Sequence, residues 1–95
     1  MTTPPAALPV VTVVTAPACH FCEDAKQALT TLSEQAPMHI RIVDIDSDEG
    51  RALIGEHRPA MNPLVLLDGR YFSAGRLPRK KLAKELRGRA PTRAN

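Results

Sequence analysis

The chain is poor in the residues that stabilise small secreted domains or anchor proteins in membranes. Its 95 residues include two cysteines, three aromatic residues and no tryptophan. Two cysteines are too few for the disulfide framework with which small secreted domains compensate for a thin core. No apolar run approaches the about 18 residues of a membrane span, and the first eighteen residues lack the Lys or Arg of a secretory signal. We therefore expect a cytoplasmic protein that makes no use of a membrane.

The composition is that of one globular domain, with 43% hydrophobic and 24% charged residues. The net charge of +3 conceals an asymmetry, because residues 1–75 hold five basic and nine acidic residues, whereas residues 76–95 hold eight basic residues and one acid. A basic end of this kind is either a solvated helix face or a contact for an anionic partner. Because no aromatic residue follows Phe72, base stacking is unsupported and no nucleic-acid partner is expected.

The apolar pattern of the first half predicts alternating strands and helices. Residues 10–15 (VVTVVT) favour a strand that is buried on both faces, as in the interior of a sheet. Apolar residues recur every three or four positions from residue 20 to about 35, which predicts an amphipathic helix with a largely wet second face. Residues 40–45 predict a second strand. Asp46 and Glu49 then resemble a capping box that begins a short helix ending near His57.

The second half predicts a hairpin followed by one more helix. Residues 64–67 and 70–73 flank Asp68-Gly69, a pair that accepts the two positive φ angles of a type I′ turn. Pro78 suits the first position of the last helix, and Gly88 suits its end. The resulting sheet is mixed, because the first unit is a parallel βαβ and the hairpin is antiparallel. We divide the chain into a disordered segment 1–9, a domain 10–88 and a basic flexible tail 89–95.

The motif Cys19-His20-Phe21-Cys22 separates the first strand from the first helix. Cysteines three positions apart on a first turn lie on the same side, close enough to form a disulfide. The unpaired N–H groups and the positive dipole end at a helix start favour a thiolate, so we expect a lowered pKa for Cys19. Cys22, one turn further and facing inward, would be the buried partner. His20 adds positive charge when protonated, whereas the two acidic residues after Cys22 act in the opposite sense.

Zinc ligation is the main alternative use of these cysteines. The chain has no second cysteine pair, and the other candidate ligands are His20, His39 and His57. His20 adjoins Cys19, which makes tetrahedral ligation by both awkward, and His39 and His57 are expected at the surface. A permanent structural disulfide is the less favoured reading, because so short a loop removes little unfolded-state entropy.

Residues 15–22 (TAPACHFC), followed by Ala25 and Lys26, resemble the active-site stretch of glutaredoxins in the thioredoxin superfamily. Asn62-Pro63-Leu64-Val65, with the Asp68-Gly69 turn and Gly75, resembles the segment with that family's cis-proline, hairpin and closing glycine. The resemblance spans about residues 10–87. It implies a thioredoxin-like α/β fold, with a four-stranded mixed sheet and three helices in the order βαβαββα, and it implies thiol–disulfide oxidoreductase activity.

The resemblance also implies roles for individual residues. Cys19 would attack a substrate disulfide, and Cys22 would then attack the mixed disulfide from within the protein. Pro63 would be cis and lie against the disulfide, and the backbone of Asn62 would pair with the substrate as an added strand. No metal site is implied by these roles.

The other expected substrate-binding residues are His20, Phe21, Gly75 and Arg76. Phe21 would offer an exposed apolar contact beside the disulfide. The amides near Gly75, helped by Arg76, would accept an anion at the start of the last helix.

The chain departs from glutaredoxins where these hold glutathione. Ala16 stands in place of their usual Lys, and Met61-Asn62-Pro63 in place of their Thr-Val-Pro. We therefore expect no bound cofactor and disfavour glutathione as the substrate. Thioredoxins typically carry a Trp-Cys-Gly-Pro-Cys motif and a buried Asp, and this chain has neither. The resemblance therefore does not assign the chain to a subfamily.

The expected partners are a disulfide-containing protein as substrate and either glutathione or thioredoxin reductase as electron donor, with the chain acting as a monomer. An iron–sulfur or metal carrier that uses the same cysteines remains the alternative function.

Overall fold

A computed structural model describes residues 8–89 of the chain; most of the predicted terminal segments 1–9 and 89–95 lies outside this range. Its elements follow the predicted order βαβαββα, with bounds β1 (Val10–Thr15), α1 (His20–Ser33), β2 (His39–Asp44), α2 (Asp48–His57), β3 (Leu64–Leu67), β4 (Arg70–Ala74) and α3 (Arg79–Arg89). Every predicted strand and helix is therefore present.

The four strands form one mixed sheet in the order β2-β1-β3-β4. β1 pairs parallel with β2 and antiparallel with β3, so Val14 lies between Val43 and Leu64. β3 pairs antiparallel with β4, with a bulge where the register shifts between Val65 and Leu66. The inner position of β1 explains why it is apolar on both faces. The outer strand β2 is less protected, and Ile42 in it is 48% exposed.

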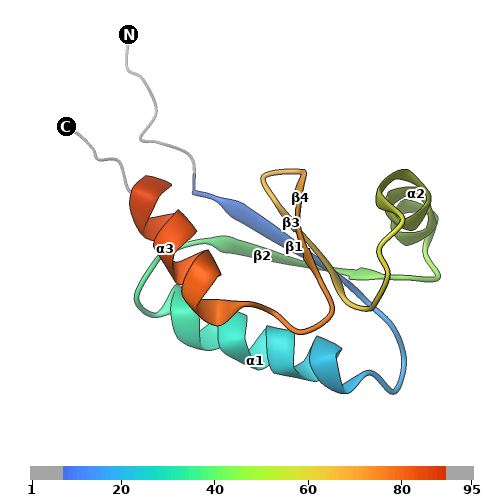
Figure 1. Cartoon of the computed structure of the whole chain (residues 1–95), viewed down its shortest axis with the longest axis horizontal. Coiled ribbons are helices and arrows are strands. Elements are labelled where there is room, and N and C mark those ends of the chain that lie inside the picture. The colour runs from blue at the N-terminus through green and yellow to red at the C-terminus, as the bar shows by residue number, and fades with distance from the viewer. Residues whose placement is uncertain (1–7, 90–95) are drawn as a thin grey trace, which may run out of the picture.

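The sheet carries a core on each face, and helices cover both (Figure 1). The larger core lies under α1 and α3 and contains Val11, Val13, Ala25, Ala28, Leu29, Val65, Leu67, Leu77, Leu82 and Leu86. The smaller core contains Val14, Val43, Leu64 and Leu66, with Leu53 and Ile54 of α2 packed against it. Because α1 contributes three residues to the larger core, its first turn is held in a fixed place relative to the ends of the strands.

The start of α2 differs from the prediction. Its N-cap is Ser47, not Asp46, because the Ser47 hydroxyl accepts a hydrogen bond from the Gly50 N–H at 2.9 Å. The same hydroxyl donates to the Asp44 carbonyl at 2.6 Å, which ties the helix to the end of β2. Glu49 does not fold back as a capping box requires, since its carboxylate binds Arg41 at 2.7 Å.

The end of α2 also departs from expectation. The side chain of His57 is only 14% exposed, whereas the sequence placed it at the surface. Its ring lies beside that of Tyr71 in β4, with 6.3 Å between the ring centroids, and this contact covers part of it.

The hairpin turn is as predicted, with positive φ at both Asp68 (51°) and Gly69 (83°). Two helix ends are shifted. α1 ends at Ser33, two residues before the predicted end. α3 begins at Arg79, after Pro78, whose carbonyl accepts the first helical hydrogen bond from the Leu82 N–H at 3.0 Å. Gly88 does not end α3, because the helix runs on to Arg89 at the limit of the described range.

Candidate functional site

Three loops meet at one end of the sheet. β1 and β3 are antiparallel and Val14 pairs with Leu64, so the chain leaving β1 and the chain entering β3 share that end. Leu64 also pairs with Ala74, which brings the loop after β4 to the same place. The sequence motifs around Cys19, Pro63 and Gly75 are thus gathered by the register of the strands.

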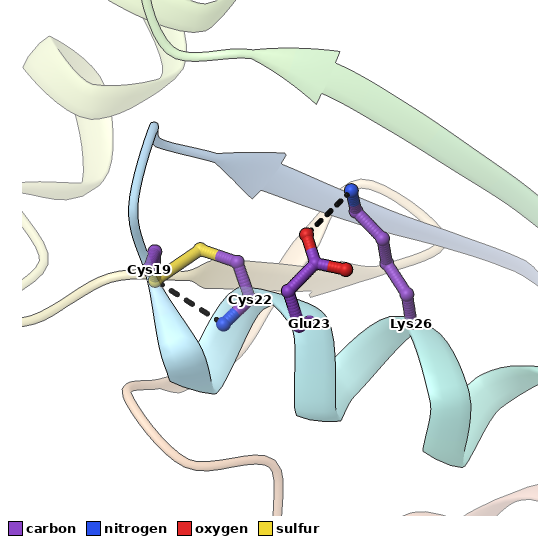
Figure 2. Close-up of a disulfide and its surroundings, with 4 residues drawn as sticks. All are labelled: Cys19, Cys22, Glu23 and Lys26. Carbon is purple, nitrogen blue, oxygen red and sulfur yellow. Dashed lines mark hydrogen bonds and ion pairs between the residues drawn. A yellow bond between two sulfur atoms is a disulfide. The ribbon is translucent and has the colours of Figure 1, made fainter.

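Cys19 and Cys22 form a disulfide at the start of α1, with their Cα atoms 5.2 Å apart (Figure 2). Cys19 is the N-cap residue in an extended conformation, and its Sγ accepts a hydrogen bond from the Cys22 N–H at 3.1 Å. Ala18 before it has a φ of 52°, a left-handed turn that redirects the chain from β1 into the helix. The sulfur of Cys19 therefore lies where an unpaired helical N–H would stabilise a thiolate.

The two sulfur-bearing residues differ in exposure. Cys22 is 1% exposed, because it lies on the same face of α1 as the buried Ala25 and Leu29. Cys19 is only half-buried. An attacking or attacked group from outside can therefore reach Cys19 and is excluded from Cys22.

The two acidic side chains nearest the start of α1 are both paired with cations. Glu23 binds the Lys26 ammonium at 3.2 Å (Figure 2), and Asp24 binds the Arg79 guanidinium at the start of α3. A carboxylate that faces a cation repels a nearby thiolate less than an unpaired one. The sequence alone does not show how the charges around Cys19 add up. Because both carboxylates are paired, their unfavourable effect on a Cys19 thiolate is weakened. The second Asp24 oxygen, Oδ2, is buried and has no hydrogen-bond partner within the described residues.

The Asn62–Pro63 peptide bond is cis, as the resemblance implied. Pro63 is fully buried and Asn62 is exposed. The Pro63 carbonyl accepts a hydrogen bond from the Gly75 N–H at 3.0 Å, which joins the loop before β3 to the loop after β4.

Gly75 is required at its position for two reasons. Its φ of 86° is unfavourable for other residues, and an added Cβ would lie 3.2 Å from the Sδ of Met61. Met61 packs over Gly75 while remaining 52% exposed. The sequence named Met61 only as a departure from the glutaredoxin pattern, and nothing in it indicated this contact.

The remaining predicted residues lie around these groups without a shared hydrogen bond in the described part of the chain. His20 and Phe21 project from the first turn of α1, where Phe21 is 37% exposed. Arg76 is exposed and lines a shallow hollow of about 340 Å³ together with Leu77, Pro78, Arg79, Lys80 and Lys81. This hollow lies at the start of α3, where the sequence placed an anion site.

A family model described as a glutaredoxin-like domain (DUF836) matches residues 10–87, which is most of the chain. The chain belongs to the glutaredoxin-like family. With its Cys-x-x-Cys pair joined at the start of α1, this glutaredoxin-like protein is a redox thiol protein. Among curated proteins, no relative matches it.

Solved structures of thioredoxins and thioredoxin-like proteins share the fold. Mitochondrial thioredoxin 3 from Saccharomyces cerevisiae is 25% identical with a TM-score of 0.58, over 84% of this chain and 77% of that one. A mutant thioredoxin from Halobacterium salinarum is 20% identical with a TM-score of 0.63, over 90% and 78%. An uncharacterised thioredoxin-like protein from Clostridium perfringens is 11% identical with a TM-score of 0.69, over 85% and 70%. The thioredoxin-like fold expected from the sequence is confirmed.

Two further properties bear on what the glutaredoxin-like chain does. Within residues 8–89, no group of three or more His, Cys, Asp or Glu side chains is arranged to hold a metal ion. None of the helices in this range has the length and apolar character needed to cross a membrane.

Proposed function

We propose that the protein is a thiol–disulfide oxidoreductase that reduces disulfides in other proteins. One observation carries the proposal: the Cys19 sulfur accepts the Cys22 N–H at the helix start, while Cys22 is 1% exposed. An accessible sulfur with a stabilised thiolate and a protected second sulfur are the two parts that dithiol exchange needs.

The reaction runs in two exchange steps. The Cys19 thiolate attacks one sulfur of the substrate disulfide; that bond breaks, and the departing thiolate takes a proton from solvent. The Cys22 thiol then loses its proton and attacks Cys19 Sγ, which forms the Cys19–Cys22 disulfide and releases the second substrate thiol. Two electrons pass to the substrate, and an external dithiol or thiol donor restores the reduced pair.

The loops around the disulfide would hold the substrate. The backbone of Asn62 would pair with an extended substrate segment; the exposure of this residue and the cis bond to the buried Pro63 support this role. His20, Phe21, Gly75 and Arg76 complete the proposed substrate-binding set, with Phe21 providing apolar contact. No bound cofactor takes part, and either glutathione or thioredoxin reductase supplies the electrons. The reducing cytoplasm suits this role, with the chain acting as a monomer.

Reduction of insulin disulfides by wild type and cysteine variants tests the proposal. Cys19→Ser should be inactive, whereas Cys22→Ser should accumulate a mixed disulfide with the substrate. Cys22→Ala is the matched control, because Ser would place a hydroxyl at a position that is 1% exposed. Equal activity of wild type and all three variants would refute the proposal.

Two additional measurements separate the open choices. Regeneration by glutathione with glutathione reductase, compared with regeneration by thioredoxin reductase, identifies the donor. Anaerobic purification tests the alternative function, since coloured, iron-containing protein without reductase activity would indicate an iron–sulfur carrier.

A further inference from the structure

The loop before α3 and α3 itself carry many cations, of which only Arg76 belongs to the proposed substrate-binding set. Residues 76–89 contain one acid, Glu85, and seven basic residues: Arg76, Arg79, Lys80, Lys81, Lys84, Arg87 and Arg89. Two of the seven have local roles. Arg79 binds Asp24, and the Lys81 ammonium lies 5.3 Å from the centre of the Phe72 ring.

Three of the other cations form a single row on α3, which we term the basic stripe: Lys80, Lys84 and Arg87. At 3.6 residues per turn, their directions around the helix axis fall within about 60°. The row points away from the core, because Leu82 (0% exposed) and Leu86 (4%) occupy the opposite side. All three side chains are exposed, and none makes an ion pair with any described residue.

The loop before α3 links the basic stripe to the redox end of the protein. Arg79, next to Lys80, binds Asp24, which is two residues beyond Cys22 in α1. Arg76 follows Gly75, which is hydrogen-bonded to Pro63, and Arg76 and Lys80 line the same hollow. In Figure 1, α3 begins apart from the start of α1 and runs further away from it. A positive surface therefore connects the substrate end of the protein with the far end of α3.

A group of acidic residues lies elsewhere in the fold. Asp44, Asp46, Asp48 and Glu49 are at the end of β2 and the start of α2, where Asp48 and Glu49 form ion pairs with Arg51 and Arg41. In Figure 1, α2 and α3 stand at opposite sides of the molecule. An anionic partner is thus attracted to α3 rather than to the α2 side, which would orient it as it approaches.

We propose that the basic stripe and Arg76 dock an acidic segment of the protein whose disulfide is reduced at Cys19. This inference rests on the proposed reductase function, because the surface leads to the disulfide. The stripe spans about 10 Å of helix at 1.5 Å per residue, the length of three to four residues in an extended peptide. A run of about four to six Asp or Glu residues near the reducible cysteines fits it. α3 has no aromatic side chain on which a nucleic-acid base could stack.

Two disulfide-bonded peptides, identical except for a tail of six Glu or six Gln residues, test this docking. Wild type should reduce the Glu-tailed peptide with a kcat/KM about eightfold higher in low salt, since each of three exposed ion pairs contributes roughly twofold. The preference should shrink in high salt. It should also disappear in the variant Lys80→Gln/Lys84→Gln/Arg87→Gln, while reduction of the Gln-tailed peptide stays unchanged.

A matched control removes three exposed cations that lie outside α3, in the variant Arg51→Gln/Arg58→Gln/Arg70→Gln. Both triple variants lower the net charge by three, so only the position of the lost charges differs. The control should keep the preference for the Glu-tailed peptide. Loss of the preference in both variants would mean that net charge alone governs the effect, which would overturn the proposal.

Other results distinguish failure of the docking proposal from failure of the proposed reductase function. Equal reduction of both peptides by wild type overturns the docking proposal and leaves the reductase function standing, whereas reduction of neither peptide refutes the function itself. Tighter binding of a DNA oligonucleotide than of the Glu-tailed peptide would assign the stripe to nucleic acid and overturn the proposal. Dimers in sedimentation that vanish in the α3 variant would assign the stripe to a second copy of the chain, and the docking proposal would then be overturned as well.

Discussion

Replacing each of two glycines in α2 by alanine should change stability in opposite directions. Alanine is favoured over glycine inside a helix by about 1 kcal/mol. At Gly55 nothing lies within 4 Å of an added Cβ, so Gly55→Ala should gain about 0.5–1 kcal/mol. At Gly50 the added Cβ would overlap the Asp44 carbonyl oxygen and lie 2.9 Å from the carbonyl carbon of Asp44 and the Cα of Ile45.

The overlap at Gly50 is with backbone, which has no rotamer into which it could move. The helix must therefore shift away from the end of β2. This movement strains the Ser47 cap and loosens Leu53 and Ile54 from the smaller core. Overpacking costs about 1–3 kcal/mol and a lost cap about 1 kcal/mol, so after the gain in helix propensity Gly50→Ala should lose about 2 kcal/mol.

Urea and thermal unfolding, both followed by far-ultraviolet circular dichroism, compare the two variants with wild type. For a domain of this size, a loss of about 2 kcal/mol should lower the melting temperature by roughly 8–16 °C, and Gly55→Ala should raise it by a few degrees. Equal stability of the two variants, or a Gly50→Ala protein as stable as wild type, would show that α2 does not approach β2 as closely as described.

Two further substitutions test the cap of α2 and the contact between α1 and α3. Ser47→Ala should lower the free energy of unfolding by about 1 kcal/mol in urea titrations, because the Gly50 N–H loses its acceptor, and Ser47→Asp should keep most of the stability. Arg79→Gln should cost at most about 1 kcal/mol, and the loss should shrink in high salt, because it removes the partner of the partly buried Asp24.

The controls for these two substitutions come from the same chain. Arg51→Gln breaks an ion pair with the fully exposed Asp48 and should leave stability unchanged. A loss at Arg79 equal to that at Arg51, or one insensitive to salt, would contradict the role given to Asp24. For the cap, a Ser47→Asp protein no more stable than Ser47→Ala would mean that the side-chain acceptor is not what stabilises the helix start.

The framework of the fold could be predicted because each element has a strong local cause. The β-branched run at 10–15 strongly favours an inner strand. Asp68-Gly69 favours a type I′ turn, because both residues accept a positive φ. The cis bond before Pro63 followed from the resemblance and is present. The parallel pairing of β1 with β2 and the antiparallel hairpin of β3 and β4 followed from the order of the elements, whereas the pairing of β1 with β3 joins strands about 50 residues apart and was not predicted.

Sequence reasoning missed two kinds of feature. One is the choice between two adjacent residues of similar propensity, and the other is contact between residues far apart in the sequence. Asp46 and Ser47 are both good N-cap residues, and only the geometry at the end of β2 selects Ser47. Asp24 meets Arg79 across 55 positions of sequence. The contact of Met61 with Gly75 likewise links two loops that no local pattern connects.

The two outer strands also bear on how the protein behaves at high concentration. β2 carries exposed His39, Arg41 and Asp44 along its length, and β4 is five residues long, begins with exposed Arg70 and is distorted by the bulge opposite Val65 and Leu66. Short, charged or kinked edges are poor templates for another molecule's strands. Even at high concentration, the edge strands of one molecule should therefore not pair with those of another, which protects the protein against aggregation.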